Sequence, residues 1–90
     1  APDSPWLFHA AANLATLYMR TDRPDRAEPL LLEALAGQRA AGGELHPDTL
    51  LLASNRAVVH LQRRRFEPAR RLLYEVLAGY RRTHPPDHPD

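Results

Sequence analysis

An internal repeat constrains the fold of this 90-residue chain more than any other feature of its sequence. Residues 27–39 and 69–81 are identical at eight of thirteen positions, and every identity falls at an offset of 42 residues. Chance would give roughly one or two identities between two such segments, even in a chain rich in alanine, leucine and arginine. We therefore expect two copies of one structural unit.

The spacing of the apolar residues predicts four helices and no strand. In four segments apolar side chains recur three or four positions apart, and no segment alternates with period two. Prolines and Gly42-Gly43 separate these segments, and we expect Asp48 or Thr49 to cap the third helix. The first predicted helix runs from Trp6 to about Arg20, and the second begins at about Pro24 and is ended by Gly42-Gly43. The third runs from Asp48 or Thr49 to about Gln62, and the fourth begins at Phe66 and stops before the tail that starts at Thr83. This is an all-α fold of two antiparallel helical hairpins.

The periodicity also predicts which side chains face the core. In the second helix these are Ala27, Leu30, Leu31, Ala34 and Leu35. In the third they are Leu50, Ala53, Ala57 and Leu61, and in the fourth Ala69, Leu72, Leu73, Val76, Leu77 and Tyr80.

Composition excludes several classes of site. The chain has no cysteine, so it has neither a disulfide framework nor a cysteine-ligated metal. Its longest apolar stretch, residues 50–53, is far too short to span a bilayer, and residues 1–5 do not resemble a signal peptide. We expect a cytoplasmic protein. The net charge is +1, but residues 4–45 carry four arginines against five acids, whereas residues 46–87 carry eight against four.

Two segments of the first copy resemble the tetratricopeptide repeat of the 42-residue kind found in kinesin light chains. Residues 13–18 resemble the first helix of that family, and residues 25–35 resemble its second helix, including the proline. His46-Pro47-Asp48-Thr49 resembles the connector between repeats, and His-Pro-Asp recurs at residues 88–90. The resemblance implies an α-solenoid.

By this resemblance residues 1–90 form a single domain with one repeat at about 4–45 and another at about 46–87. Residues 83–90 are then a proline-rich tail or the start of a further repeat.

The second copy departs from the family pattern within its first helix. Small residues at Ala15 and Ala27 let the two helices of a hairpin approach closely. Arg56 replaces a leucine and His60 a tyrosine in the second copy. An unpaired buried arginine would be costly, so we expect a rotated helix, or a packed stem with its head in solvent.

The resemblance implies a non-catalytic protein-interaction scaffold. In the family, the first helix of each hairpin lines a concave face that grips a peptide or a partner helix. Asn13 and Asn55, 42 residues apart, either bond backbone as a structural ladder or capture the peptide backbone of a partner. The expected partner-binding residues are His9, Asn13, Thr16, Met19, Arg20, Ser54, Asn55, Val58 and Gln62. By the same resemblance, Ala12, Leu51 and Leu61 lie on the same groove face.

Two alternative functions stay open. The chain could self-associate, because two repeats rarely suffice alone, or it could bind nucleic acid through the arginine-rich second copy. The expected partner is a protein or peptide, with arginines favouring an acidic one. A further copy or further repeats of the same chain are also considered. We expect no membrane, cofactor or metal, although His84 to His88 have metal-like spacing. No catalytic constellation is found, so we do not expect an enzyme.

Overall fold

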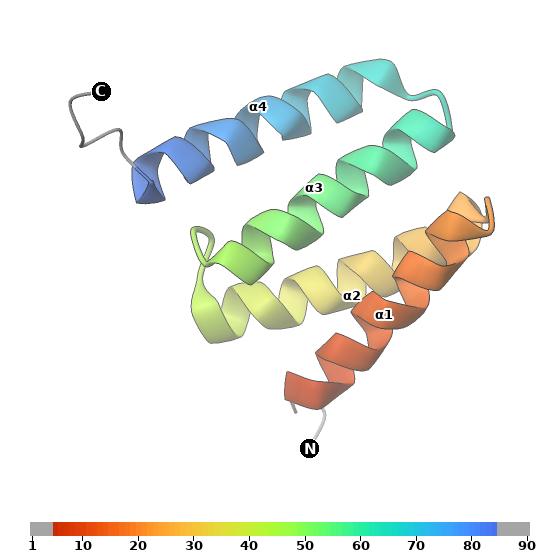
Figure 1. The fold of residues 1–90 in the computed structure, drawn as a ribbon, viewed down its shortest axis with the longest axis horizontal. Helices are drawn as coiled ribbons and strands as arrows, with labels where there is room; N and C mark the ends of the chain where they lie inside the picture. Colours follow the sequence, from red (N-terminus) through yellow and green to blue (C-terminus); the bar gives the residue numbers. More distant parts are fainter. Residues whose placement is uncertain (1–4, 85–90) are drawn as a thin grey trace.

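The computed structural model describes residues 5–84, which form four α-helices and no strand. The helices are α1 (Pro5–Arg20), α2 (Pro24–Gly42), α3 (Pro47–Gln62) and α4 (Phe66–Thr83). Successive helices pack against each other, so that α1 and α4 lie on opposite sides of the central α2–α3 pair (Figure 1). The all-α prediction is confirmed, and the helix ends agree with the predicted ones to within one or two residues.

The turns within the two hairpins have the same conformation. Asp22 and Arg64, 42 residues apart, have φ values of 62° and 60°. The N–H group of Arg23 donates to the carbonyl of Tyr18 at 2.8 Å, and the corresponding bond one repeat later has the same length. This is the Schellman arrangement, in which a residue of left-handed conformation ends a helix and the next amide satisfies a carbonyl five residues back. The 42-residue period therefore extends to the backbone of the turns.

Each hairpin is held together where small residues of its two helices meet. Ala15 of α1 and Ala27 of α2 are fully buried, as are their counterparts Ala57 and Ala69. The core then continues across both hairpins as a cluster of buried side chains, namely Ala15, Ala27, Leu31, Ala34, Leu35, Leu52, Ala53 and Val59. The predicted inward face of α2 is confirmed, with Leu30 packed at the edge of this cluster.

Two glycines in the second helices allow a second close approach. The ring of Phe8 occupies the space where a Cβ atom of Gly37 would lie. One repeat later, the Cδ2 atom of Leu50 lies 2.9 Å from the Cβ position of Gly79. Both pairs join equivalent positions of the repeat, because Phe8 and Leu50 are also 42 residues apart. A glycine in a helix interior costs stability, and here it is compensated by closer packing of the two helices.

The start of α3 differs from the prediction. The N-cap is His46, whose ring Nδ1 accepts a hydrogen bond from the N–H group of Asp48 at 3.0 Å. Thr49, predicted as a possible cap, is buried and donates its hydroxyl to the carbonyl of Gly43 at 2.7 Å. Its side chain therefore fastens α3 to the end of α2.

Part of the predicted inward faces of α3 and α4 is exposed. Leu61, Leu73, Leu77 and Tyr80 are all exposed, whereas Ala69 is buried and Leu72 and Val76 pack at the edge of the core. Within residues 5–84 no helix lies over these four side chains, so a face that is apolar in sequence has no neighbour to bury it.

The second hairpin, formed by α3 and α4, has buried polar atoms at two positions. Arg56 and His60 stand there in place of Leu14 and Tyr18 of the first hairpin. Helix α3 is not rotated, since Ala57 is as deeply buried as Ala15. Arg56 is half-buried and its Nε atom has no hydrogen-bond partner, and the same is true of the Nδ1 atom of buried His60. One expectation from the sequence places the guanidinium group of Arg56 in solvent. For its buried Nε atom this expectation is wrong. Burial lowers the pKa of His60 below its ordinary value, and the nearby guanidinium of Arg56 lowers it further.

We expect Gly37→Ala to lower the free energy of unfolding by about 2 kcal/mol, because the new methyl group would collide with the rigid ring of Phe8. Gly79→Ala is the matched control, since a rotation of the flexible Leu50 side chain relieves most of its clash. Urea denaturation of the two variants measures the difference. A Gly37→Ala variant as stable as wild type would contradict this packing.

We expect the free energy of unfolding to fall as the pH drops below the ordinary histidine pKa of 6.5. In that range the unfolded chain takes up a proton that His60 in the folded chain resists, so acidification favours unfolding. His60→Tyr, which restores the residue found in hairpin one, should lose this part of the pH dependence. Exposed His9→Gln should keep it. Denaturation series between about pH 7.5 and pH 5 make the comparison, and parallel curves for wild type and His60→Tyr would refute it.

Candidate partner-binding groove

A hollow of about 170 Å³ lies between α1 and α3. Its walls come from the two first helices of the hairpins, with one residue of α2 at its edge. The lining residues are Phe8, His9, Ala12, Asn13, Thr16, Gln38, Asp48, Leu51, Leu52 and Asn55. The contact between α2 and α3 creates this hollow, since it sets α1 and α3 side by side.

The hollow brings together four of the nine predicted partner-binding residues. These are His9, Asn13, Thr16 and Asn55. The other five, Met19, Arg20, Ser54, Val58 and Gln62, lie outside it. Arg20 and Val58 are exposed, and Ser54 is half-buried. The binding role of all nine stays a prediction.

Met19 and Gln62 have a structural contact. The side-chain Nε2 of Gln62 donates to the backbone carbonyl of Met19 at 3.0 Å, which joins the end of α3 to the end of α1. Met19 also packs against the core. Both residues therefore contribute to the connection between the repeats.

The prediction missed Phe8, Gln38, Asp48 and Leu52. Gln38 was missed because the family resemblance assigned the groove to first helices alone, and Gln38 belongs to α2. Asp48 was considered only as a helix cap. A signal for Phe8 was present in the sequence, since the glycines of the second helices, 42 residues apart, each imply a large neighbour in the facing helix.

The lining of the hollow combines amide groups with apolar side chains. Asn13, Asn55 and Gln38 each carry one acceptor and two donor hydrogens. Among residues 5–84 the structure contains no hydrogen bond from the side-chain amides of Asn13 and Asn55, so the structural ladder, one of the two roles considered for them, is not formed there. The hydroxyl of Thr16, by contrast, donates to the carbonyl of Ala12 at 3.0 Å.

Neither a group of metal-ligating side chains nor a membrane-spanning helix occurs in the described part of the chain. In residues 5–84 no three histidine, aspartate or glutamate side chains are grouped so that they could hold a metal ion. The tail considered for metal binding lies, apart from His84, outside the described residues. No helix in the same range is long and apolar enough to cross a bilayer.

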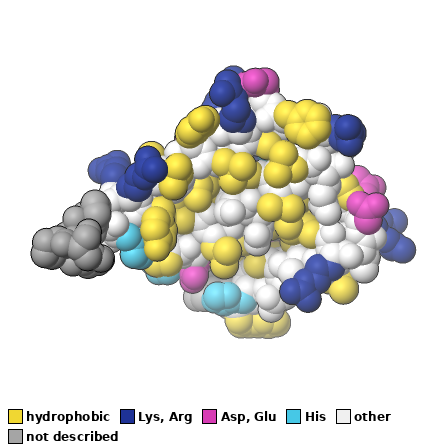
Figure 2. Space-filling view, turned by 45° about the horizontal axis from the view of Figure 1, so that its top comes forward, with side chains coloured by type: hydrophobic (Ala, Val, Ile, Leu, Met, Phe, Trp, Pro, Cys, Tyr) yellow, Lys and Arg dark blue, Asp and Glu magenta, His cyan; other side chains and the backbone are white. Residues whose placement is uncertain are grey.

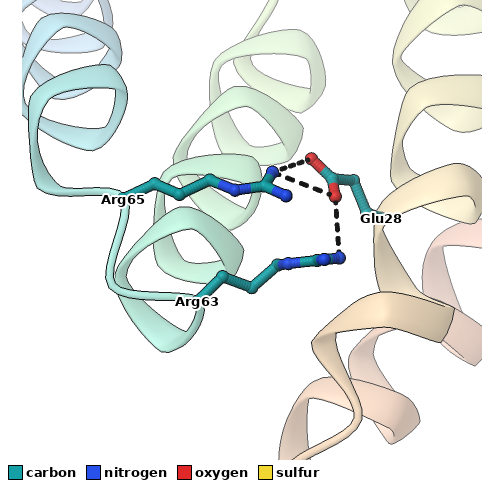
Figure 3. A network of polar contacts seen from close by, with 3 residues as sticks. All are labelled: Glu28, Arg63 and Arg65. Atoms are coloured by element: carbon teal, nitrogen blue, oxygen red, sulfur yellow. Dashed lines mark hydrogen bonds and ion pairs between the residues drawn. The ribbon is translucent and has the colours of Figure 1, made fainter.

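The arginine-rich turn between α3 and α4 makes an ion-pair cluster with α2 (Figure 3). Arg63 and Arg65 each direct an Nη1 atom at the carboxylate of Glu28, at 3.2 and 3.3 Å. The guanidinium of Arg64 lies 5.6 Å from the ring centroid of Phe66. Two of the three arginines therefore connect the two repeats.

We expect Glu28→Gln to lower the free energy of unfolding by about 1 kcal/mol, because two guanidinium groups lose a carboxylate whose side chain is only 18% exposed. Glu67→Gln is the control, since its contact with Arg70 at 3.6 Å is between side chains that are 74% and 66% exposed. Its effect should stay below about 0.5 kcal/mol. Urea denaturation measures both, and equal effects would argue against a bridging role for Glu28.

Comparison with known protein families supports the resemblance seen in the sequence. Residues 6–82 match a family described as "Tetratricopeptide repeat". No curated protein matches the chain. The matched span includes every residue that lines the hollow. The family prediction is confirmed, while its narrower kinesin-light-chain form stays a prediction.

Proposed function

Because the chain belongs to the tetratricopeptide repeat family, we propose that it is a protein-interaction module whose hollow between α1 and α3 receives a segment of a partner protein. Repeats of this family generally mediate protein–protein interaction. The finer part of the proposal is the location of the binding site and the kind of segment it takes.

The size of the hollow favours a side chain of a partner over a separate small molecule. Its volume of about 170 Å³ lies below the range of roughly 300–1,000 Å³ that is typical of small-molecule sites. An apolar side chain of the partner would pack between Leu51 and Phe8 in the lining of the hollow. The rest of the partner segment would then lie along the open edge.

The asparagine amides are the observation that carries the proposal. Asn13 and Asn55 line the same hollow from two different helices, and a peptide backbone needs both a donor and an acceptor. An extended segment between them can bond one amide with its N–H group and the other with its carbonyl. The partner segment is therefore proposed to bind in extended form, held chiefly through its backbone.

The charges near the hollow indicate where an acidic residue of the partner would bind. The lining contains Asp48 and no arginine. An acidic side chain is therefore disfavoured in the hollow itself and would have to reach exposed Arg20 at the end of α1. The hydroxyl of Thr16 already donates to a backbone carbonyl, which leaves the hollow without a positioned nucleophile and supports a non-catalytic role.

A displayed library of short random peptides provides a probe. We expect peptides selected on the wild-type chain to bind an Asn13→Ala, Asn55→Ala double variant at least tenfold more weakly, because two backbone hydrogen bonds are lost. Glu33→Ala on the exposed face of α2 is the control and should bind as wild type does. Circular dichroism checks that both variants are folded. Unchanged affinity of the double variant for every selected peptide would show that the groove is misplaced.

A further inference from the structure

The outer helices α1 and α4 each have an apolar face that no other helix of the described residues covers. Helix α1 packs mainly against α2 and α4 mainly against α3, whereas each central helix packs against two others. Figure 2 shows hydrophobic side chains gathered on the side of the molecule that carries α4, with arginines around the margin. The packing of α3 on α2 within the chain indicates which kind of helix such faces can bind.

Helix α3 contacts α2 through one stripe of residues. The hydroxyl of Thr49 bonds the end of α2, and Arg63, fourteen residues later, bonds Glu28 near the start of α2. Leu52 and Val59 fall between them at helical spacing, on the same stripe, and both are buried. These residues define the face with which α3 lies on α2.

Helix α2 packs against this stripe through buried leucines. The leucines at the corresponding positions of α4 are exposed. Leu31 and Leu35 are 0% and 1% exposed, whereas Leu73 and Leu77, one repeat later, are 39% and 41% exposed. The two α4 leucines line an open hollow of about 420 Å³. Apart from Arg70 its lining is apolar or aromatic, and consists of Leu61, Phe66, Arg70, Leu73, Tyr74 and Leu77. Helix α4 therefore has the same kind of apolar face as α2, but no helix of the described residues covers it.

Helix α1 carries the other half of the same contact. The positions that correspond to Thr49, Leu52 and Val59 are occupied by Leu7, Ala10 and Leu17, and all three are exposed. This stripe is at least as apolar as the one on α3. One chain thus presents both halves of its own inter-repeat contact, on opposite sides of the molecule (Figure 1).

We propose that this chain self-associates head to tail, with α1 of a second copy lying on α4 as α3 lies on α2. The contact joins two different faces, so it leaves one of each free and continues into a linear array. The repeat would then run from copy to copy with the period that it has within the chain. This association uses the outer edges of the molecule and leaves the hollow between α1 and α3 open.

The charges show how this contact differs from the internal one. The position of Glu28 is taken by Arg70 in α4, and the position of Arg65 is taken by Arg23, the N-cap residue of α2 in the turn that follows α1. The ion pair of the internal contact is therefore replaced by two like charges. Association of the native chain is expected to be weaker than the internal packing and to strengthen as salt screens the repulsion.

Sedimentation velocity at increasing concentration tests the proposal with a charge change at one position. The wild-type chain should form species that grow beyond the dimer, and Arg70→Glu should lower the dissociation constant roughly threefold to fivefold by restoring an ion pair with Arg23. Arg71→Glu makes the same change of charge at a residue that faces Arg56 and His60, outside the proposed contact, and should have no such effect. Equal effects of the two variants would overturn the proposed register.

Removal of the apolar contact gives a second test. Leu73→Asp should weaken association at least tenfold, because a carboxylate would be buried against the leucines of α1. Leu32→Asp, at an exposed leucine of α2, is the control and should associate as wild type does. Circular dichroism verifies that each variant is folded. A chain that stays monomeric up to about 1 mM, or that stops at a closed dimer, would overturn the proposal.

Because the chain has no cysteine, its orientation can also be tested by cross-linking. Gln62 reaches Met19 within the chain, so Arg20 of one copy should lie near Leu61 of the next. An Arg20→Cys variant mixed with a Leu61→Cys variant should be joined by a short bis-maleimide, while each variant alone should not. Cross-links within either variant alone, or none in the mixture, would count against the head-to-tail arrangement.

Discussion

The packing of α2 against α3 is the contact on which the rest of the structure depends. It joins two hairpins that are otherwise linked chiefly by the hydrogen bond from Gln62 to Met19. Buried leucines form its centre, while the Thr49 hydroxyl and the Glu28 carboxylate fix its two ends. The same contact sets the separation of α1 and α3, and so the hollow in which we place a partner. The stability of the fold and the shape of the proposed binding site therefore depend on the same pair of helices.

Most of the fold could be predicted because its determinants are local and occur twice. Alanine pairs such as Ala15 and Ala27 permit close helix packing wherever they occur, and the 42-residue offset repeats even in the φ values of Asp22 and Arg64. The errors at Leu61, Leu73 and Leu77 have one cause. Periodicity shows which face of a helix is apolar, but it does not show whether another helix lies there to cover it.

The candidate site was predicted less completely. The prediction included His9, Asn13, Thr16 and Asn55, which line one hollow, because the resemblance pointed to α1 and α3, the two helices that form most of its walls. Phe8 and Gln38 depend on how α1 crosses α2, which is set by the missing side chain of Gly37 and by no pattern within α1 itself. The cap at His46 was missed because histidine is not among the usual N-cap residues, although its Nδ1 can accept the same bond.

The unequal coverage of the four helices also determines how the molecule opens. In a linear stack, each unit is stabilised only by its immediate neighbours, so opening begins at the ends and moves inwards. In a single, unassociated copy, the amide hydrogens of α2 and α3 should then exchange with solvent most slowly, and those of α4 and α1 earlier. A segment bound across α1 and α3 would connect an outer helix to a central one. Such a ligand would slow the exchange of the α1 amide hydrogens and leave that of the α4 amide hydrogens unchanged.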